Sequence, residues 1–204
     1  MKTKLIFLSA ILIMAVTSTY GQKSKQDSTF RRHFIGTSGF MLANLAPNPP
    51  SFYQINFGYW LTKRDVISIE AKTWTYKHPL GIPYGTSFEA PEYEYPGYIR
   101  EYGIGIAYQR YLWKDLYTAI HAAPFLQKYV DKDGKKIQNG FQLFMTGRIG
   151  YHVRLFKDRF FIEPSLAVTY WPINTNTPNG FKKLEDKWPN YFLFEPGFHL
   201  GVKF

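Results

Sequence analysis

The stretch FEPGFHLGVKF, residues 194–204, carries an apolar residue or proline at every even-numbered position. Its odd-numbered positions hold Glu, Gly, His and Lys. A period of two predicts a β-strand with one apolar face. Chain ends are usually loosely held unless they pair with another element. We therefore expect this last strand to pair with another strand of the same protein.

The same alternation recurs along the chain and predicts eight strands. In the second, Tyr53, Ile55 and Phe57 alternate with Gln54 and Asn56. Both faces of the first strand are mixed. The predicted strands are residues 34–44, 53–61, 66–74, 98–112, 116–127, 141–152, 162–170 and 191–204.

The links between these strands alternate in length. Short links, TKRD, WKD and FKDR, follow the second, fourth and sixth strands, whereas longer links rich in Pro, Gly, Asn and Tyr follow the third and seventh. Short periplasmic turns and long extracellular loops are typical of transmembrane barrels, whose strands need about ten residues to cross. We predict an all-β fold, an eight-stranded antiparallel transmembrane up-and-down β-barrel over residues 31–204, with both termini periplasmic. The alternative is a secreted β-sandwich.

The N-terminal stretch MKTKLIFLSAILIMAVTSTYGQ has two lysines, an apolar run and then small and polar residues. This form predicts a cleaved signal peptide over residues 1–21, followed by a short periplasmic segment, 22–30. The alternative, a membrane anchor, needs about 18 apolar residues, and this run is shorter. Cleavage would remove Lys2 and Lys4 and lower the formal charge from +10 to +8.

Composition agrees with an exported membrane protein. Cysteine is absent, so hydrogen bonds and packing must hold the fold without disulfides. Aromatic residues make up 19% of the chain, and they favour the border between lipid and water. The mean hydropathy of -0.28 would suggest a soluble protein. A transmembrane barrel can have such a low mean hydropathy, because its apolar lipid-facing residues alternate with polar interior residues.

In architecture, residues 31–204 resemble the small eight-stranded outer-membrane barrels of Gram-negative bacteria, the OmpA-type and OmpX-type group. In those families the barrel assembly machinery reads alternating apolar residues and a terminal Phe as an insertion signal. The matching residues here are Phe198, Leu200, Val202 and Phe204. The resemblance implies contact with outer-membrane lipids, including lipopolysaccharide. It implies no activity, because one fold hosts many functions.

The positions predicted to face the barrel interior carry four acids, three bases and three histidines. An eight-stranded barrel encloses a space that side chains can fill, and buried charges need partners. We therefore expect an internal salt-bridge network, with a proton or ion path as the alternative. The residues are Glu70, Lys72, Glu101, His121, Arg148, His152, Glu163, Glu195, His199 and Lys203.

We predict no catalytic residues, no cofactor and no metal site, although the sequence leaves an enzymatic function open. The interior histidines lie on separate strands without a ligand spacing. Ser165, Glu163 and His152 come nearest to a nucleophile, acid and base, but they point inward near the periplasmic end, away from lipid A. No phosphate-binding or nucleic-acid motif is present. The positive charge suits an anionic lipid surface.

Two basic residues suggest a lipid contact. If the WKD turn sets Tyr111 opposite Tyr117, then Arg100 stands opposite Lys128 on the outer wall. Like charges side by side repel unless an anion lies between them, and Arg suits a phosphate. We hypothesise that Arg100 and Lys128 bind a lipopolysaccharide phosphate. The alternative is that both reach water.

These observations favour a monomeric, non-enzymatic outer-membrane protein that is structural or recognises a partner through its extracellular loops. The Tyr- and Pro-rich loop over residues 78–98 is the main candidate, because loops on a rigid scaffold commonly carry recognition. It could equally cap the barrel mouth. The rival functions are a narrow pore for ions or small solutes and a lipid A modifying enzyme. The sequence names no ligand for the loops.

Overall fold

The computed structural model describes residues 30–77, 96–186 and 190–204. Its contacts divide the chain into two units, Met1–Phe30 and Arg31–Phe204. Everything below concerns the second unit. The predicted signal peptide, nearly all of the 22–30 segment and most of the 78–98 loop lie outside the described residues.

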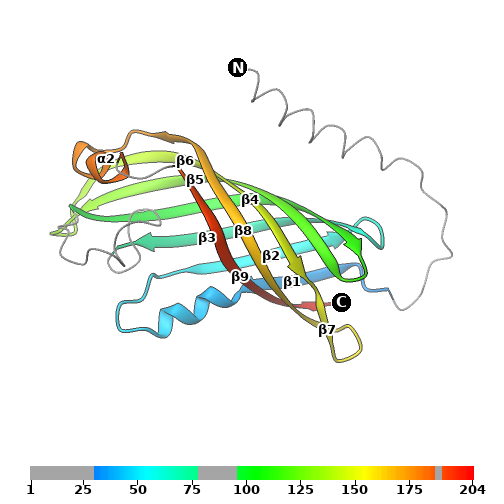
Figure 1. Ribbon diagram of the computed structural model, residues 1–204. Helices are drawn as coiled ribbons and strands as arrows, with labels where there is room; N and C mark the ends of the chain where they lie inside the picture. The colour runs from blue at the N-terminus through cyan, green and yellow to red at the C-terminus, as the bar shows by residue number, and fades with distance from the viewer. Residues whose placement is uncertain (1–29, 78–95, 187–189) are drawn as a thin grey trace, which may run out of the picture. The chain divides into compact units, whose positions relative to one another are not determined.

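The second unit is all-β, and its strands form one antiparallel sheet that closes in a ring (Figure 1). Consecutive strands from β1 to β6 pair with one another, β6 and the short β7 both pair with β8, and β9 pairs with β8 and β1. The strands are β1 (His33–Ser38), β2 (Tyr53–Trp60), β3 (Asp65–Tyr76), β4 (Gly97–Trp113), β5 (Leu116–Asp131), β6 (Lys136–Tyr151), β7 (Val153–Leu155), β8 (Phe160–Thr175) and β9 (Tyr191–Lys203). A 3-10 helix, η1 (Gly39–Leu45), follows β1, and α2 (Asn179–Glu185) lies between β8 and β9.

The C-terminal strand closes the ring, as its alternating sequence predicted. Register runs from Phe34 opposite Lys203 to Ser38 opposite His199. Beyond the strand ends, His33 N donates to Phe204 O at 3.2 Å and Phe204 N donates to His33 O at 2.9 Å. The backbone of the last residue is therefore hydrogen bonded to the start of β1.

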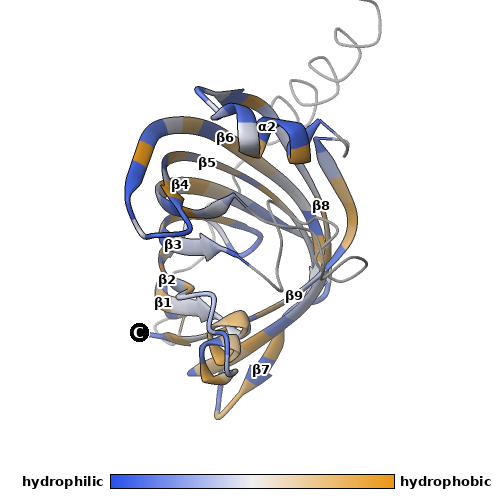
Figure 2. Ribbon diagram, turned by 90° about the vertical axis from the view of Figure 1, so that its left-hand side faces the viewer, coloured by the Kyte–Doolittle hydropathy of each residue, from blue (hydrophilic) through white to orange (hydrophobic). Residues whose placement is uncertain are grey.

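The two faces of the sheet have opposite polarity. In the hydropathy colouring of Figure 2, hydrophilic and hydrophobic residues alternate along parts of the sheet, for example along β6. On β4, Ile104 and Ile106 are 68% and 66% exposed, whereas Glu101 is only 1% exposed. The outer face carries rows of exposed apolar residues. The inner face carries buried polar residues such as Glu101 together with buried aromatic residues such as Trp171. Soluble proteins rarely leave such extended apolar rows exposed.

Nine strands form among the residues that the structure describes, where the sequence predicted eight, because the sixth is interrupted at His152. β6 pairs with β5 as far as Leu116 opposite Tyr151, where β5 begins. His152 N then donates to Asp115 O in the β4–β5 turn, at 2.9 Å. The chain resumes as the three residues of β7, which pair with β8.

The first strand is shorter than predicted. The sequence pattern suggested a strand over 34–44, but β1 ends at Ser38 and η1 follows. The Ser38 hydroxyl caps η1 by accepting a hydrogen bond from Phe40 N. Gly39 allows the turn to pack closely, because a Cβ there would lie 2.3 Å from the Phe198 ring. The part of β9 before Phe198 therefore has no strand partner on its β1 side.

Links of different kinds gather at opposite ends of the ring. The β2–β3, β4–β5 and β7–β8 turns lie at one end, and η1 and α2 lie toward the other (Figure 1). The β5–β6 link, at the end that carries α2, is also short. Asp131 Oδ1 there accepts from Asp133 N and Lys135 N, and Gly134 has a φ of 80°. Among residues 30–77, 96–186 and 190–204, no helix is long and apolar enough to cross a membrane.

Candidate functional site

The ten residues predicted to face inward are all at least half-buried. Half of them are buried, namely Glu70, Glu101, His152, Glu163 and Lys203. The others are half-buried, namely Lys72, His121, Arg148, Glu195 and His199. They form separate small groups along the ring interior.

The first group joins β3 to β5. His121 Nδ1 lies 2.9 Å from Glu70 Oε1, and Lys72 Nζ lies 3.8 Å from Glu70 Oε2. Glu70 stands opposite Gly105 on the intervening strand. Because Gly105 has no side chain, the carboxylate can pass over β4 to reach β5. Both oxygens of this buried acid therefore have basic partners.

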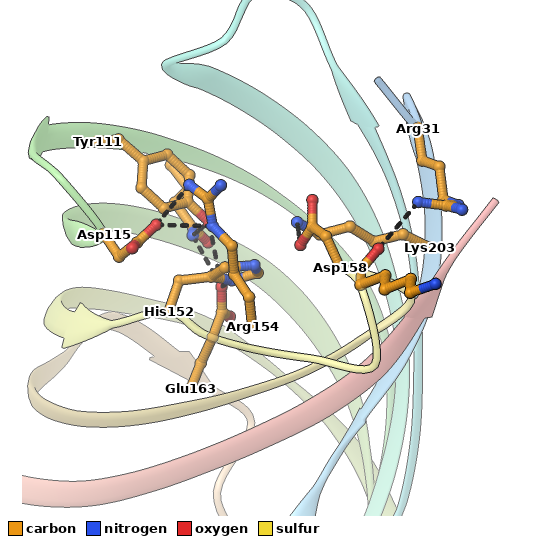
Figure 3. Close-up of polar contacts among 10 residues, drawn as sticks. Arg31, Tyr111, Asp115, His152, Arg154, Asp158, Glu163 and Lys203 are labelled. Atoms are coloured by element: carbon orange, nitrogen blue, oxygen red, sulfur yellow. Dashed lines mark hydrogen bonds and ion pairs between the residues drawn. The ribbon is translucent and has the colours of Figure 1, made fainter. Parts of the chain in front are cut away.

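The second group lies nearer the short-turn end and surrounds Glu163 on β8 (Figure 3). His152 Nδ1 lies 2.7 Å from Glu163 Oε1, and Gln109 Nε2 donates to the same oxygen at 3.0 Å. The Tyr111 hydroxyl donates to it at 3.4 Å. The His152 ring also stacks on Phe161, with centroids 4.9 Å apart. Hydrogen bonding and ring packing together fix the position of His152.

Lys203 ties β9 to the β7–β8 turn (Figure 3). Its Nζ lies 2.8 Å from Asp158 Oδ1 and 4.7 Å from the centroid of the Trp60 ring. The lysine side chain is only 3% exposed. At the outer edge of the same end, Arg154 Nε donates to Asp115 Oδ1 at 2.9 Å. Charged side chains thus connect the turns at this end of the ring.

The structure does not assemble a serine nucleophile from the predicted trio. His152 and Glu163 meet, but the Ser165 hydroxyl accepts a hydrogen bond from Arg148 Nη1 at 2.8 Å. Among the described residues, no hydrogen bond joins Ser165 to His152. A guanidinium cannot take a proton from the serine, so this arrangement does not activate it. Gly197 makes room for the contact, since a Cβ there would overlap Arg148.

Side chains fill much of the interior. A cavity of about 30 Å³ lies among Glu70, His121, Arg148 and other residues of the two groups, which is room for one or two water molecules. Toward the end that carries α2, two aromatic clusters occupy the ring. One comprises Tyr76, Ile99, Tyr129 and Phe181, and the other Ala123, Phe125, Phe144 and Trp171.

Sequence reasoning did not single out the uncharged members of these groups. Trp60, Gln109 and Tyr111 hold Glu163, His152 and Lys203 in place, although none was selected as a site residue. The signal was available for Trp60, because it continues the inward row of Gln54 and Asn56 on β2. Charge does not identify such residues, whereas their position in the alternating pattern does.

The predicted facing pair on the outer wall has the expected register. Arg100 stands opposite Lys128, and Tyr111 opposite Tyr117. Arg100 Nη1 donates to Ser51 O at 2.8 Å and to Thr75 Oγ1 at 2.7 Å, toward β3 and away from β5. Lys128 is exposed. A phosphate contact by this pair stays a prediction.

Comparison with known proteins finds neither a family model nor a curated sequence that matches the chain. Within the described residues, no group of three or more His, Cys, Asp or Glu side chains is placed to hold a metal ion. Any functional conclusion therefore rests on the polarity, packing and charge of the residues described above.

Proposed function

We propose that the chain is an integral outer-membrane β-barrel protein with a filled polar interior. It acts as a structural or surface-recognition protein through the loops at the end that carries η1 and α2. The observation that carries this proposal is the exposed apolar outer face of a closed sheet whose inner face holds buried charged residues.

The outer apolar rows are extensive. Ile104, Ile106 and Leu126 are each about two-thirds exposed, and they lie on two neighbouring strands. Burying one such side chain stabilises a protein by roughly 1.5–3 kcal/mol, so leaving many of them in water is unfavourable. Soluble monomers rarely expose large contiguous apolar patches. Lipid would cover these rows. A sheet closed in a ring is suited to a lipid environment, because it leaves few backbone N–H and C=O groups without hydrogen-bond partners.

Exposed aromatic residues lie toward both ends of the apolar rows. On β4, Tyr102 and Tyr108 flank Ile104 and Ile106. Aromatic girdles at the two interfaces are typical of outer-membrane barrels. Others toward the end that carries α2 are Tyr53, Tyr191 and Phe192, and others toward the short-turn end are Trp113, Tyr151, Phe160 and Phe204.

The orientation follows from the link lengths. Short turns face the periplasm in such barrels, which places the end with η1 and α2 outside the cell. A signal peptide over residues 1–21 and recognition of the last strand by the assembly machinery complete the proposal. The proposed location is the outer membrane of a Gram-negative bacterium, where the monomer contacts lipopolysaccharide.

Site-directed spin labelling tests the membrane location directly, because the native chain has no cysteine. The protein with a nitroxide at Ile104→Cys, on the outer face of β4, is reconstituted in lipid vesicles. We expect this label to collide more with oxygen, which partitions into lipid, than with a water-soluble nickel chelate. The matched control, Asp133→Cys in the exposed β5–β6 turn, should show the opposite preference. Greater nickel accessibility at position 104 would contradict the proposal.

The filled interior favours a scaffold over the narrow pore. Paired charges and aromatic clusters leave a cavity of only about 30 Å³ between the two groups and one of about 10 Å³ beside Trp60, Tyr111 and Lys203. We expect no steady unit conductance when the protein is inserted in a planar bilayer. Reproducible single-channel steps that scale with the number of inserted molecules would support the pore instead.

A further inference from the structure

α2 places a carboxylate, that of Glu185, near the inner face of the sheet at one end of the ring. Phe181 of α2 is fully buried and packs against Tyr76, Ile99 and Tyr129 on β3, β4 and β5. Figures 1 and 2 show α2 beside the ends of β5 and β6. Glu185, the last residue of α2, is thereby held close enough to Glu101 on β4 for their charges to interact.

One oxygen of Glu101 is held by neighbouring strand residues. Gln127 Nε2 donates to Glu101 Oε1 at 2.6 Å, and the Tyr129 hydroxyl donates to Gln127 Oε1 at 2.8 Å. Glu101 itself is 1% exposed. Its other oxygen, Oε2, is buried with no hydrogen-bond partner among the described residues. The carboxylate is thus oriented with one oxygen unsatisfied.

Glu185 has the same arrangement. Asn174 Nδ2 on β8 donates to Glu185 Oε2 at 2.9 Å, and Thr177 lies close to this carboxylate. In the described structure, Glu185 Oε1 and Asn174 Oδ1 are buried without partners. Thr177 also lies 3.2 Å from the Tyr129 hydroxyl, so a chain of polar contacts connects the two acids.

A fully buried amide completes the group. Gln142 on β6 stands directly opposite Asn174 in the register and is 0% exposed. Neither its Nε2 nor its Oε1 has a partner among residues that the structure describes. A buried polar group without a partner costs about 1–3 kcal/mol, and several in one place indicate a missing ligand.

The unsatisfied oxygens define the chemistry of that ligand. Two carboxylates would balance the charge of a divalent cation, and the amides add neutral oxygen donors. Oxygen-only donors suit Ca²⁺ or Mg²⁺, not Zn²⁺, which prefers nitrogen and sulfur. Donors from four separate elements form an irregular set, which Ca²⁺ accepts more readily than Mg²⁺.

We propose that this cluster beneath α2 is a Ca²⁺ site, which the sequence pattern does not reveal. Its side-chain ligands are Glu101, Gln142, Asn174 and Glu185. The bound cation fastens α2, and with it the β8–β9 loop, to β4, β6 and β8. The proposal needs only the folded ring and does not depend on the membrane function above.

The test uses the purified full-length chain in detergent micelles, stripped with EDTA and then titrated with CaCl₂. We expect a rise in Tm that saturates with a Kd of about 10⁻⁴–10⁻³ M, the range of weak extracellular sites. Tb³⁺ should give luminescence sensitised by the neighbouring Tyr129, and Ca²⁺ should displace it. No Tm rise and no sensitised luminescence in the wild type up to about 10 mM, well above that range, would overturn the proposal.

Variants assign the site. Glu101→Gln and Glu185→Gln should each weaken Ca²⁺ binding at least tenfold, whereas Glu163→Gln removes an interior carboxylate at the other end and should bind like wild type. Gln142→Leu should weaken Ca²⁺ binding yet keep or raise the Tm in EDTA, because it removes an unpartnered buried amide. This pairing separates ligand loss from misfolding. Equal Ca²⁺ binding by wild type, Glu101→Gln and Glu185→Gln would overturn the site.

Discussion

The β4–β5 pair and the β1–β9 pair belong to one sheet, yet they are joined in different ways. β4 and β5 have 17 and 16 residues, and their register runs from Gly97 opposite Asp131 to Trp113 opposite Leu116. β1 has only six residues, and its pairing with β9 stops at Ser38. Backbone hydrogen bonds between strands therefore make up most of the β4–β5 interface, whereas the β1–β9 interface has few of them.

Side chains replace the missing ladder around β1. Thr37 Oγ1 donates to Gln54 O on β2 at 2.6 Å, and Asn44 of η1 hydrogen bonds to both the N and the O of Phe52. Lys203 joins β9 to Asp158, and the Phe34 ring meets Phe161 edge-on. The difference indicates that single side-chain changes matter more around β1 and β9 than along β4–β5.

The largest difference in unfolding free energy should be between variants of two lysines, Lys203 and Lys128. Lys203→Ala removes the buried partner of Asp158, and we expect a loss of about 2 kcal/mol, below the usual value for a broken buried pair because Asp158 is partly solvated. Lys128→Ala, at the β4–β5 interface, removes an exposed charge opposite Arg100 and should change little. Urea unfolding followed by tryptophan fluorescence measures both. Equal losses would remove the distinction between the two interfaces.

A second test compares side-chain to backbone hydrogen bonds. Asn44→Ala leaves both Phe52 N and Phe52 O without this partner and should cost about 1–2 kcal/mol. Thr73→Val removes one hydroxyl contact to Glu101 O between β3 and β4, where a continuous ladder remains. We expect it to cost about half as much. A larger loss from Thr73→Val in the same unfolding assay would argue against the contrast.

A third test asks how firmly α2 holds the long strands. Burial raises the pKa of Glu185 above its ordinary value of 4.5. The folded state thus favours the protonated acid, so this contribution to stability is full below pH 4.5 and is lost as the pH rises through the raised pKa. In EDTA, hydrogen exchange at the Lys182 amide, which donates to Pro178 O at 2.9 Å, should show more opening of α2 over that range once it is corrected for its intrinsic pH dependence. Glu185→Gln should remove the pH dependence, and an unchanged profile would refute the assignment.

The smallest effect on stability concerns Pro196. Lys203 N donates to Arg159 O, next to β8, and Phe204 N donates to His33 O, next to β1. Backbone N–H groups alternate in direction along a strand, so an N–H at an even-numbered position from 196 to 204 points toward the β1 side. Pro196 thus has no N–H at a position without a strand partner. Pro196→Ala should change unfolding by less than about 0.5 kcal/mol, as for most exposed sites. It should, however, increase dimer formation in cross-linking, because it adds a free donor to an edge. Leu166→Ala, on the paired neighbour β8, should not.

The sequence pattern predicted most of this fold because alternation is a local signal. The outward residues of β4 and the closing of the ring by the last strand both follow from it. The pattern failed where tertiary contacts decide. GFMLANL is apolar enough for a strand, but the Ser38 cap and the packing of Gly39 on Phe198 turn it into η1. α2 is too short for a helical period to be recognised.

The interior was predictable as a set but not as pairs. Alternation placed Glu70 and His121 on the inner face, yet only the shear of the ring and the small Gly105 decide that they meet. For the same reason the sequence could not identify Gln142 as a site residue. Nothing in the local sequence distinguishes a glutamine with hydrogen-bond partners from one without them. The balance of acidic and basic residues in the interior indicated that charges are paired. It could not show which acid pairs with which base.

The brevity of β1 has a consequence for the order of folding. The residues that close the ring, His33 and Phe204, stand at opposite ends of the described chain, so joining them costs more loop entropy than forming any hairpin. Contacts so distant in sequence slow folding, and a six-residue strand returns little free energy until its side chains are in place. The hairpins from β2 to β6 should therefore form first, and closure should be the late, rate-limiting step. Until then the edges of β1 and β9 stay open to mispairing, and any factor that holds those two edges together would act as a catalyst of folding.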